Sequence, residues 1–319
     1  MTNRKMAIIF VLLCLCFHLM PHQALSVSTS DAAEPIMPEK ECSLTISYCH
    51  ADTAFSDLEV KLYKIAEVSA DFQYTLTQPF EASGLILNGI QTVGEWNVVR
   101  STLEAYILAN HITPEFTAAT NEDGQVTFGT LMTGMYLATV GQAEQENLQC
   151  RFDSALIALP GLGNDGMWQY QVSVNAKGEV LPPVEPDDET FKVLKLWRGD
   201  ENQNDRPKSI EVEIFCNGIS YKTVTLSEDN HWAYTWSAKN DGSSWTVIER
   251  NVPQGYTMTV EERQSTFVLT NTWTPTYPDD PGRPPQTGDT SNILLNVLLM
   301  IGSGSMLIIL GVTGKKSCL

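Results

Sequence analysis

Three polar residues lie at positions where the spacing of apolar residues predicts a buried face. Successive side chains of a strand point to opposite faces, so residues two apart share a face. By this spacing Lys195, Glu249 and Asn271 each fall on an apolar face of a predicted strand. The apolar residues that share these faces are Phe191, Val193 and Trp197 for the lysine, Trp245 and Val247 for the glutamate, and Phe267, Leu269 and Trp273 for the asparagine.

A lysine, a glutamate and an asparagine in one apolar core must satisfy one another or react, because an unpaired buried charge is very costly. Burial favours the neutral forms of both an amine and a carboxylic acid. A neutral Lys195 amine is able to attack the side-chain carbonyl carbon of Asn271 while Glu249 moves protons and ammonia leaves. The alternative is a buried Lys–Glu pair with a hydrogen-bonded asparagine and no covalent bond.

The elements that position these residues are short alternating strands between residues 190 and 274. Regular spacing of short strands, with turns between them, predicts a seven-stranded β-sandwich. The predicted strands are 191–197, 210–216, 221–226, 232–236, 245–249, 257–261 and 266–272.

This segment resembles the Cna B-type repeat of collagen adhesins from end to end. The resemblance implies an internal isopeptide bond between Lys195 and Asn271, with Glu249 in the catalytic role. The matching motifs are Val193-x-Lys195-x-Trp197, Arg206-Pro207, Val247-x-Glu249, Pro253-x-Gly255-Tyr256 and Leu269-Thr270-Asn271-Thr272.

A first domain is predicted over residues 42–180, with alternating strands and one helix at 95–110 whose apolar stripe faces the core. It resembles the N-terminal domain of Gram-positive pilins. The predicted fold is therefore mainly β, with two tandem immunoglobulin-like or Cna B-type sandwich domains, the first with one helix. The matching pieces are Leu62-Tyr63-Lys64, Leu103-x-x-Tyr106, residues 123–128, Gly134-x-Tyr136-Leu137, Leu159-Pro160 and residues 166–172.

Signals at the two ends of the chain predict export and anchoring. Residues 1–26 read as a signal peptide and 27–41 as a disordered leader, while 181–189 is a Pro/acidic linker and 275–287 a Pro-rich stalk. An uncharged apolar run at 293–312, followed by two lysines, predicts a transmembrane helix. One interpretation of this C-terminal segment is an ordinary single-pass membrane anchor on a Pro-rich stalk; the alternative interpretation follows from the residues just before the apolar run.

Residues 284–319 resemble a sortase cell-wall sorting signal. The motif is LPXTG-like, with proline at the position where the family usually has leucine. The resemblance implies cleavage between Thr287 and Gly288. The motif residues are Pro284, Pro285, Gln286, Thr287 and Gly288.

Lys177 lies close to the position at which pilus backbone subunits carry the lysine that sortase joins to the next subunit; a solvated lysine at a strand end is the alternative. The formal net charge of −18 argues against nucleic acid as a partner. No metal or cofactor is predicted, because Asp205 occupies the glycine position of the calcium-like loop that begins at Asp200. Pairing among Cys42, Cys49 and Cys150 is left open.

Taken together, the sequence predicts a secreted protein anchored to a Gram-positive cell wall, which spans the membrane before sortase cleavage. The expected role is a minor or anchoring pilus subunit, and the alternative is a monomeric wall-anchored adhesin. The expected partners are sortase, a peptidoglycan precursor or neighbouring pilin subunit, and a host matrix protein. No enzyme activity is expected beyond one autocatalytic turnover.

Overall fold

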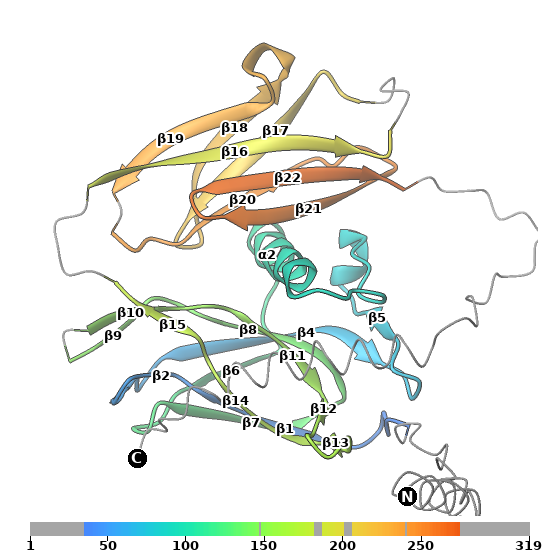
Figure 1. Cartoon of the computed structure of the whole chain (residues 1–319), viewed down its shortest axis with the longest axis vertical. Helices are drawn as coiled ribbons and strands as arrows, with labels where there is room; N and C mark the ends of the chain where they lie inside the picture. Colours follow the sequence, from blue (N-terminus) through green and yellow to red (C-terminus); the bar gives the residue numbers. More distant parts are fainter. Residues whose placement is uncertain (1–34, 147, 182–186, 201–205, 240, 275–319) are drawn as a thin grey trace, which may run out of the picture. The chain divides into compact units, whose positions relative to one another are not determined.

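The computed structural model describes residues 35–146, 148–181, 187–200, 206–239 and 241–274 (Figure 1). All of the described residues belong to one compact unit. The described residues are mainly β, as the sequence predicts, and they carry one α-helix.

The first sandwich is built from two sheets that share one buried cluster. Strand β1 alternates buried and half-buried residues, so that Leu44 and Ile46 face the core. β1 lies between a parallel neighbour, β14, and an antiparallel one, β7. The strands of these two sheets are β14 (Gln171–Asn175), β1 (Cys42–Ser47) and β7 (Gln125–Leu131) in one, and β11 (Ala155–Leu159), β8 (Gly134–Val140), β4 (Glu59–Val68), β5 (Tyr74–Leu76) and β6 (Phe116–Ala119) in the other.

Shorter elements complete this sandwich. β10 joins β9 and β15 in a small sheet, and two further strand pairs form hairpins. These elements are β2 (Cys49–His50), β3 (Thr53–Ala54), η1 (Phe80–Ser83), β9 (Ala143–Gln145), β10 (Leu148–Phe152), β12 (Gly161–Leu162), β13 (Trp168–Gln169) and β15 (Gly178–Val180).

The predicted disordered leader, 27–41, differs from the structure over the residues that are described. Ile36 is buried, and its N–H donates to the Ala70 carbonyl oxygen. The N–H of Met37 donates to the Tyr170 hydroxyl at 2.9 Å. Burial of the apolar Ile36 side chain offsets the conformational entropy lost when the segment is ordered. The end of this segment is therefore part of the first sandwich.

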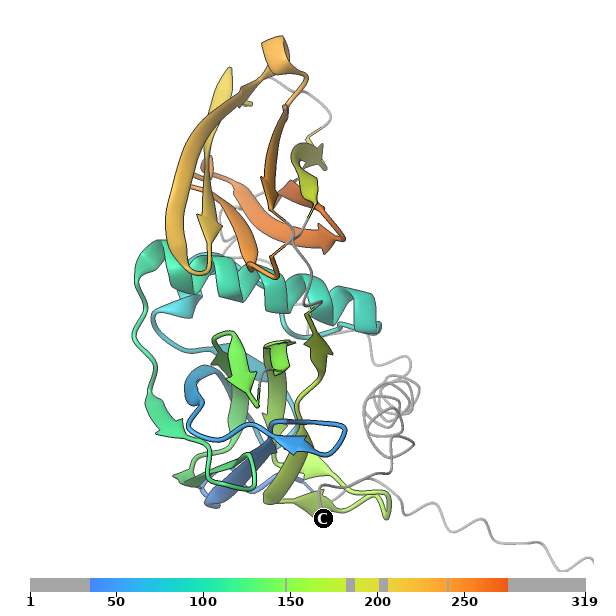
Figure 2. The ribbon, with the colours of Figure 1, turned by 90° about the vertical axis from the view of Figure 1, so that its left-hand side faces the viewer.

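Helix α2 (Val93–Asn110) contains the predicted helix and begins two residues earlier, because Thr92 and Glu95 form a capping box. One face carries the predicted stripe, with Val99, Leu103 and Ile107 buried against the first sandwich. A second face is also buried, which the sequence analysis did not predict. Figure 2 shows the length of the helix beside the second sandwich.

The second sandwich pairs a four-stranded sheet with a three-stranded one, and the seven predicted strands are confirmed. The predicted strand at 232–236 begins at Ala233, because Trp232 has positive φ. The strand order of the four-stranded sheet is β19 (Ala233–Lys239), β16 (Asp188–Arg198), β22 (Thr266–Trp273) and β21 (Tyr256–Arg263). The order of the three-stranded sheet is β18 (Ile219–Ser227), β17 (Ser209–Cys216) and β20 (Trp245–Glu249). The short helix η2 (Glu228–Asn230) lies between β18 and β19 in the sequence.

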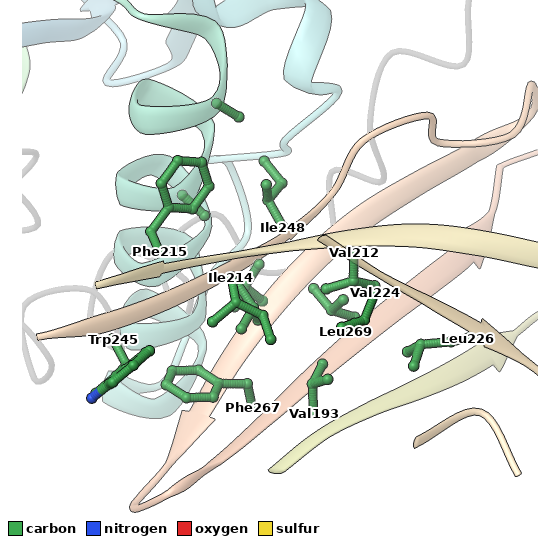
Figure 3. Packing of buried hydrophobic residues seen from close by; sticks show 14 of the residues in the cluster. Val193, Val212, Ile214, Phe215, Val224, Leu226, Trp245, Ile248, Phe267 and Leu269 are labelled. Carbon is green, nitrogen blue, oxygen red and sulfur yellow. The ribbon is translucent and has the colours of Figure 1, made fainter. Parts of the chain in front are cut away.

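Figure 3 shows how the inner faces of the two sheets meet in one core. Val193 and Leu269 from β16 and β22 lie opposite Val212 and Ile214 of β17. The strands that carry the three candidate residues therefore contribute to a single apolar cluster.

No helix within the described ranges is long and apolar enough to span a membrane. The predicted transmembrane helix at 293–312, the signal peptide at 1–26 and the stalk at 275–287 lie outside those ranges.

Replacing Thr92 by Ala should lower the free energy of unfolding by about 1 kcal/mol. The change removes the side-chain oxygen that accepts the Glu95 N–H. Chemical denaturation followed by far-UV circular dichroism measures the loss. Asn97→Ala, on the exposed side of the same helix, is the control and should not destabilise the protein; equal stability of the two variants would contradict the cap.

Candidate functional site: a buried lysine, glutamate and asparagine

The parallel pairing of β16 with β22 sets the spacing between Lys195 and Asn271. In this register Lys195 lies opposite Leu269, and Trp197 lies opposite Asn271. Asn271 is therefore one inward-facing position further along the sheet than the lysine. Glu249 comes from β20, an outer strand of the facing sheet. The three candidate residues thus meet between the sheets from three different strands.

The Glu249 carboxyl group contacts both of the other side chains. Lys195 Nζ donates to Oε2 at 2.7 Å, and Asn271 Nδ2 donates to Oε1 at 3.1 Å. The exposed fractions of the lysine, glutamate and asparagine are 5%, 2% and 0%. Both carboxyl oxygens are thus hydrogen-bonded in a buried site, and one group touches the amine and the amide together.

Burial lowers the pKa of Lys195 from 10.5 to about 8, although the neighbouring Glu249 carboxylate opposes the shift. Nζ also lies 4.7 Å from the centre of the Trp197 ring. With this pKa, roughly one lysine in ten is neutral near pH 7. The amine therefore has access to its nucleophilic form at ordinary pH.

The Asn271 side-chain oxygen, Oδ1, is buried and has no hydrogen-bond partner within the described part of the chain. A buried carbonyl oxygen without a donor is unfavourable. The carbonyl end of this amide is therefore unsatisfied. The site combines an amine of lowered pKa, an amide and a carboxyl group that contacts both.

Aromatic rings and one ion pair close the end of the sandwich beside the site. Trp197 packs edge-on against Trp232 and Tyr256, with ring centres 5.5 Å and 5.2 Å away. Arg206 stacks over Trp197 and pairs with Asp200. This ring of contacts separates Lys195 from solvent.

Asp200, the first residue of the calcium-like loop, pairs with an arginine and a tyrosine. The Asp200 carboxylate accepts hydrogen bonds from Arg206 and from the Tyr256 hydroxyl. The hydrogen bond from Arg206 is the main cause that lowers the pKa of Asp200 to about 2, and the hydrogen bond from Tyr256 contributes less. The described ranges contain no cluster of three or more His, Cys, Asp or Glu that could hold a metal ion. Arg206 and Tyr256 stand in the sequence as motif residues, but their spacing alone did not predict this pairing.

The other predicted site residues lie away from the three. Lys177 is exposed between β14 and β15, and its carbonyl oxygen accepts the Asp153 N–H. Cys42 and Cys150 are both buried and neither forms a disulfide. The sorting-motif residues Pro284, Pro285, Gln286, Thr287 and Gly288 lie outside the described residues.

Comparison with known families matches residues 191–272 to the family described as Cna protein B-type domain. A curated relative, "Collagen adhesin" of Staphylococcus aureus, is 27% identical over 210 residues, which cover 57% of this chain and 18% of that protein. The chain therefore spans less than a fifth of the length of that relative.

Solved structures give weaker likenesses. They include a single B repeat unit of the collagen binding surface protein of S. aureus (16% identity, 74% of this chain and 100% of that one, TM-score 0.26). The full-length major pilin SpaD of Corynebacterium diphtheriae (11%, 76% and 99%, 0.27) and the minor pilin GBS52 of Streptococcus agalactiae (16%, 76% and 100%, 0.23) are similar to the same degree.

The depressed pKa of Lys195 predicts a distinctive pH dependence in a variant that cannot form a bond, Asn271→Leu. The folded state releases the lysine proton near pH 8, whereas the unfolded state keeps it until about pH 10.5. The penalty of burying the charge is complete below pH 8 and is relieved as the pH rises.

Between pH 8 and about 9.5 the free energy of unfolding of Asn271→Leu should therefore rise by roughly 1–2 kcal/mol relative to a control that also carries Lys195→Met and Glu249→Gln. Urea denaturation at each pH measures the difference. A difference that stays flat or falls with pH would contradict the assigned shift.

Proposed function

Since residues 191–272 form a Cna protein B-type domain, we propose that this domain joins Lys195 to Asn271 by an intramolecular isopeptide bond. We propose further that the protein is a structural component of a Gram-positive cell surface. The observation that carries the first proposal is the Glu249 carboxyl group, which touches the attacking amine and the amide at the same time.

The reaction needs no group from outside the site. Proton transfer within the Lys195–Glu249 pair gives a neutral amine and a neutral acid. The amine nitrogen attacks Asn271 Cγ, and a C–N bond forms. In the tetrahedral intermediate the Glu249 acid delivers its proton to Nδ2, and the resulting carboxylate takes one from Nζ. The bond from Cγ to Nδ2 then breaks, ammonia leaves, and the acid is regenerated.

The unsatisfied Asn271 oxygen supports a role for the neutral acid before attack. Half a turn of the amide exchanges its oxygen and nitrogen and places Oδ1 against Glu249. A protonated Glu249 then donates to Oδ1, which polarises the carbonyl and stabilises the negative charge of the tetrahedral intermediate. The same rotation gives Oδ1 the donor that it lacks.

The strands that the bond would join are the first and last of the sandwich, β16 and β22. A pull on the two ends of the domain would pass through the covalent link before it could separate the intervening strands. The product therefore suits a protein that has to resist pulling and proteolysis.

Intact mass spectrometry of the purified protein should show the loss of one ammonia for each chain. Glu249→Gln keeps the shape of the side chain but cannot relay a proton, so this variant should retain the full mass. Glu211→Gln, an exposed carboxylate on β17, is the matched control and should lose ammonia as the wild type does. A folded wild-type protein with its full mass would overturn the bond.

The proposal of surface anchoring rests on the sequence of residues 284–319. Sortase would cut between Thr287 and Gly288 and pass the new acyl group to an amine of a peptidoglycan precursor or a neighbouring pilin subunit. Two domains favour a minor or anchoring subunit, as do Ala176 and Gly178, which flank Lys177 where the pilin motif prefers proline and asparagine. The protein would span the membrane until the cut is made.

A second candidate is a monomeric wall-anchored adhesin. The similarity over 57% of this chain to a protein named collagen adhesin favours it. In that case the partner would be a host matrix protein, and the chain would form no polymer.

Cell-wall extracts boiled in SDS distinguish these roles. For a minor or anchoring subunit, an immunoblot should show a ladder of covalent species that survives Lys177→Ala, because another subunit supplies the joining lysine. Lys208→Ala, a control on the second sandwich, should leave the ladder unchanged as well. Collapse of the ladder in Lys177→Ala alone would make the protein a shaft subunit. A single wall-linked band in every strain would favour the adhesin.

A further inference from the structure

Strand β21 has one strand partner in the described residues, β22, and its other edge faces away from the sheet. The proposed bond would tie β16 to β22 and would leave β21 held by hydrogen bonds alone. An unprotected edge strand frays and offers its backbone groups to other chains. Whether β21 frays therefore depends on what covers its outer edge, with or without the bond.

A single hydroxyl group of helix α2 takes the place of a neighbouring strand. Thr102 Oγ1 accepts the Val260 N–H at 2.8 Å and donates to the Val98 carbonyl oxygen at 2.7 Å. The Val260 carbonyl oxygen lies 3.4 Å from the same hydroxyl. Thr102 is 1% exposed. The Val260 N–H, which lies on the outer edge of β21, is thus hydrogen-bonded to a side chain from the other sandwich.

Small side chains on the same helix face allow this close approach. Ala105 and Ala109 belong to the buried cluster of the second sandwich, together with Ile248, Met258 and Val260. Figure 3 shows Phe215 and Ile248 beside the helix ribbon. The helix thus closes the side of the sandwich where β20 and β21 form the outer strands of the two sheets.

An arginine makes a second link at the end of the helix. Arg250 Nη1 donates to the Ala109 carbonyl oxygen at 2.8 Å, and the guanidinium also pairs with Glu213 of β17. The last carbonyl groups of a helix lack partners within the helix and carry partial negative charge. Arg250 satisfies one of them from the strand end that follows Glu249.

We propose that α2 is a built-in edge cover for the second sandwich, which holds β21 in place and makes the two sandwiches unfold as one unit. The partner surface is the face of α2 that carries Thr102, Ala105 and Ala109. This inference goes beyond the proposed bond and does not depend on it. The edge cover acts on the strand next to the pair that the bond would join.

Amide-resolved hydrogen exchange on the full protein tests the cover. Thr102→Val keeps the β-branched shape and removes the oxygen that accepts the Val260 N–H. We expect the Val260 amide to exchange at least about tenfold faster in this variant. Asn97→Ala, on the exposed side of α2, is the matched control and should leave Val260 protected. Equal Val260 rates in Thr102→Val and wild type would overturn the proposal.

Differential scanning calorimetry tests the single unit. The wild type should melt in one transition, whereas Ala105→Arg, which forces a long charged side chain into the contact, should split it in two. Two transitions in the wild type would overturn the proposal, as would one unchanged transition in a folded Ala105→Arg protein. Intact mass of the same samples reports the isopeptide bond separately, so failure of one idea is distinguishable from failure of the other.

Discussion

A lysine amine and a glutamate carboxyl group can be buried together only if they contact each other, and the second sandwich is arranged around that contact. Burial of Lys195 at 5% exposure is tolerable because Glu249 lies 2.7 Å away on the opposite sheet. The pair fixes how β20 faces β16, and the parallel register then places Asn271 against the same carboxyl group. Removing either charge would leave the other unpaired in an apolar core.

The sequence predicted this site because the physics of strands is simple where one face is apolar. Period-two spacing alone placed Lys195, Glu249 and Asn271 inside, and the seven strands followed from the same alternation. This alternation did not predict the local backbone at Trp232, because a positive φ at a non-glycine residue does not change the spacing of apolar residues. The domain boundaries and the chain ends remain predictions.

The second buried face of α2 was missed for a different reason. Thr102, Ala105 and Ala109 are too small or too polar to register as an apolar stripe, although all three are buried. Their signal lay in size and not in hydropathy, and it has meaning only once a partner surface is known. The pairing of Asp200 with Arg206 escaped in the same way, since a carboxylate in a loop suits a metal as well as a guanidinium.

Parallel first and last strands also decide where the polypeptide enters and leaves the domain. Because β16 and β22 run in the same direction, the chain comes in at one end of the sandwich and goes out at the other. Copies of such a module are therefore able to follow one another head to tail along a line, without doubling back. β16 has 11 residues, so at ~3.3 Å per residue each added copy would extend a stalk by roughly 35 Å. Gene duplication is then a direct means of adjusting how far a surface protein reaches from the cell.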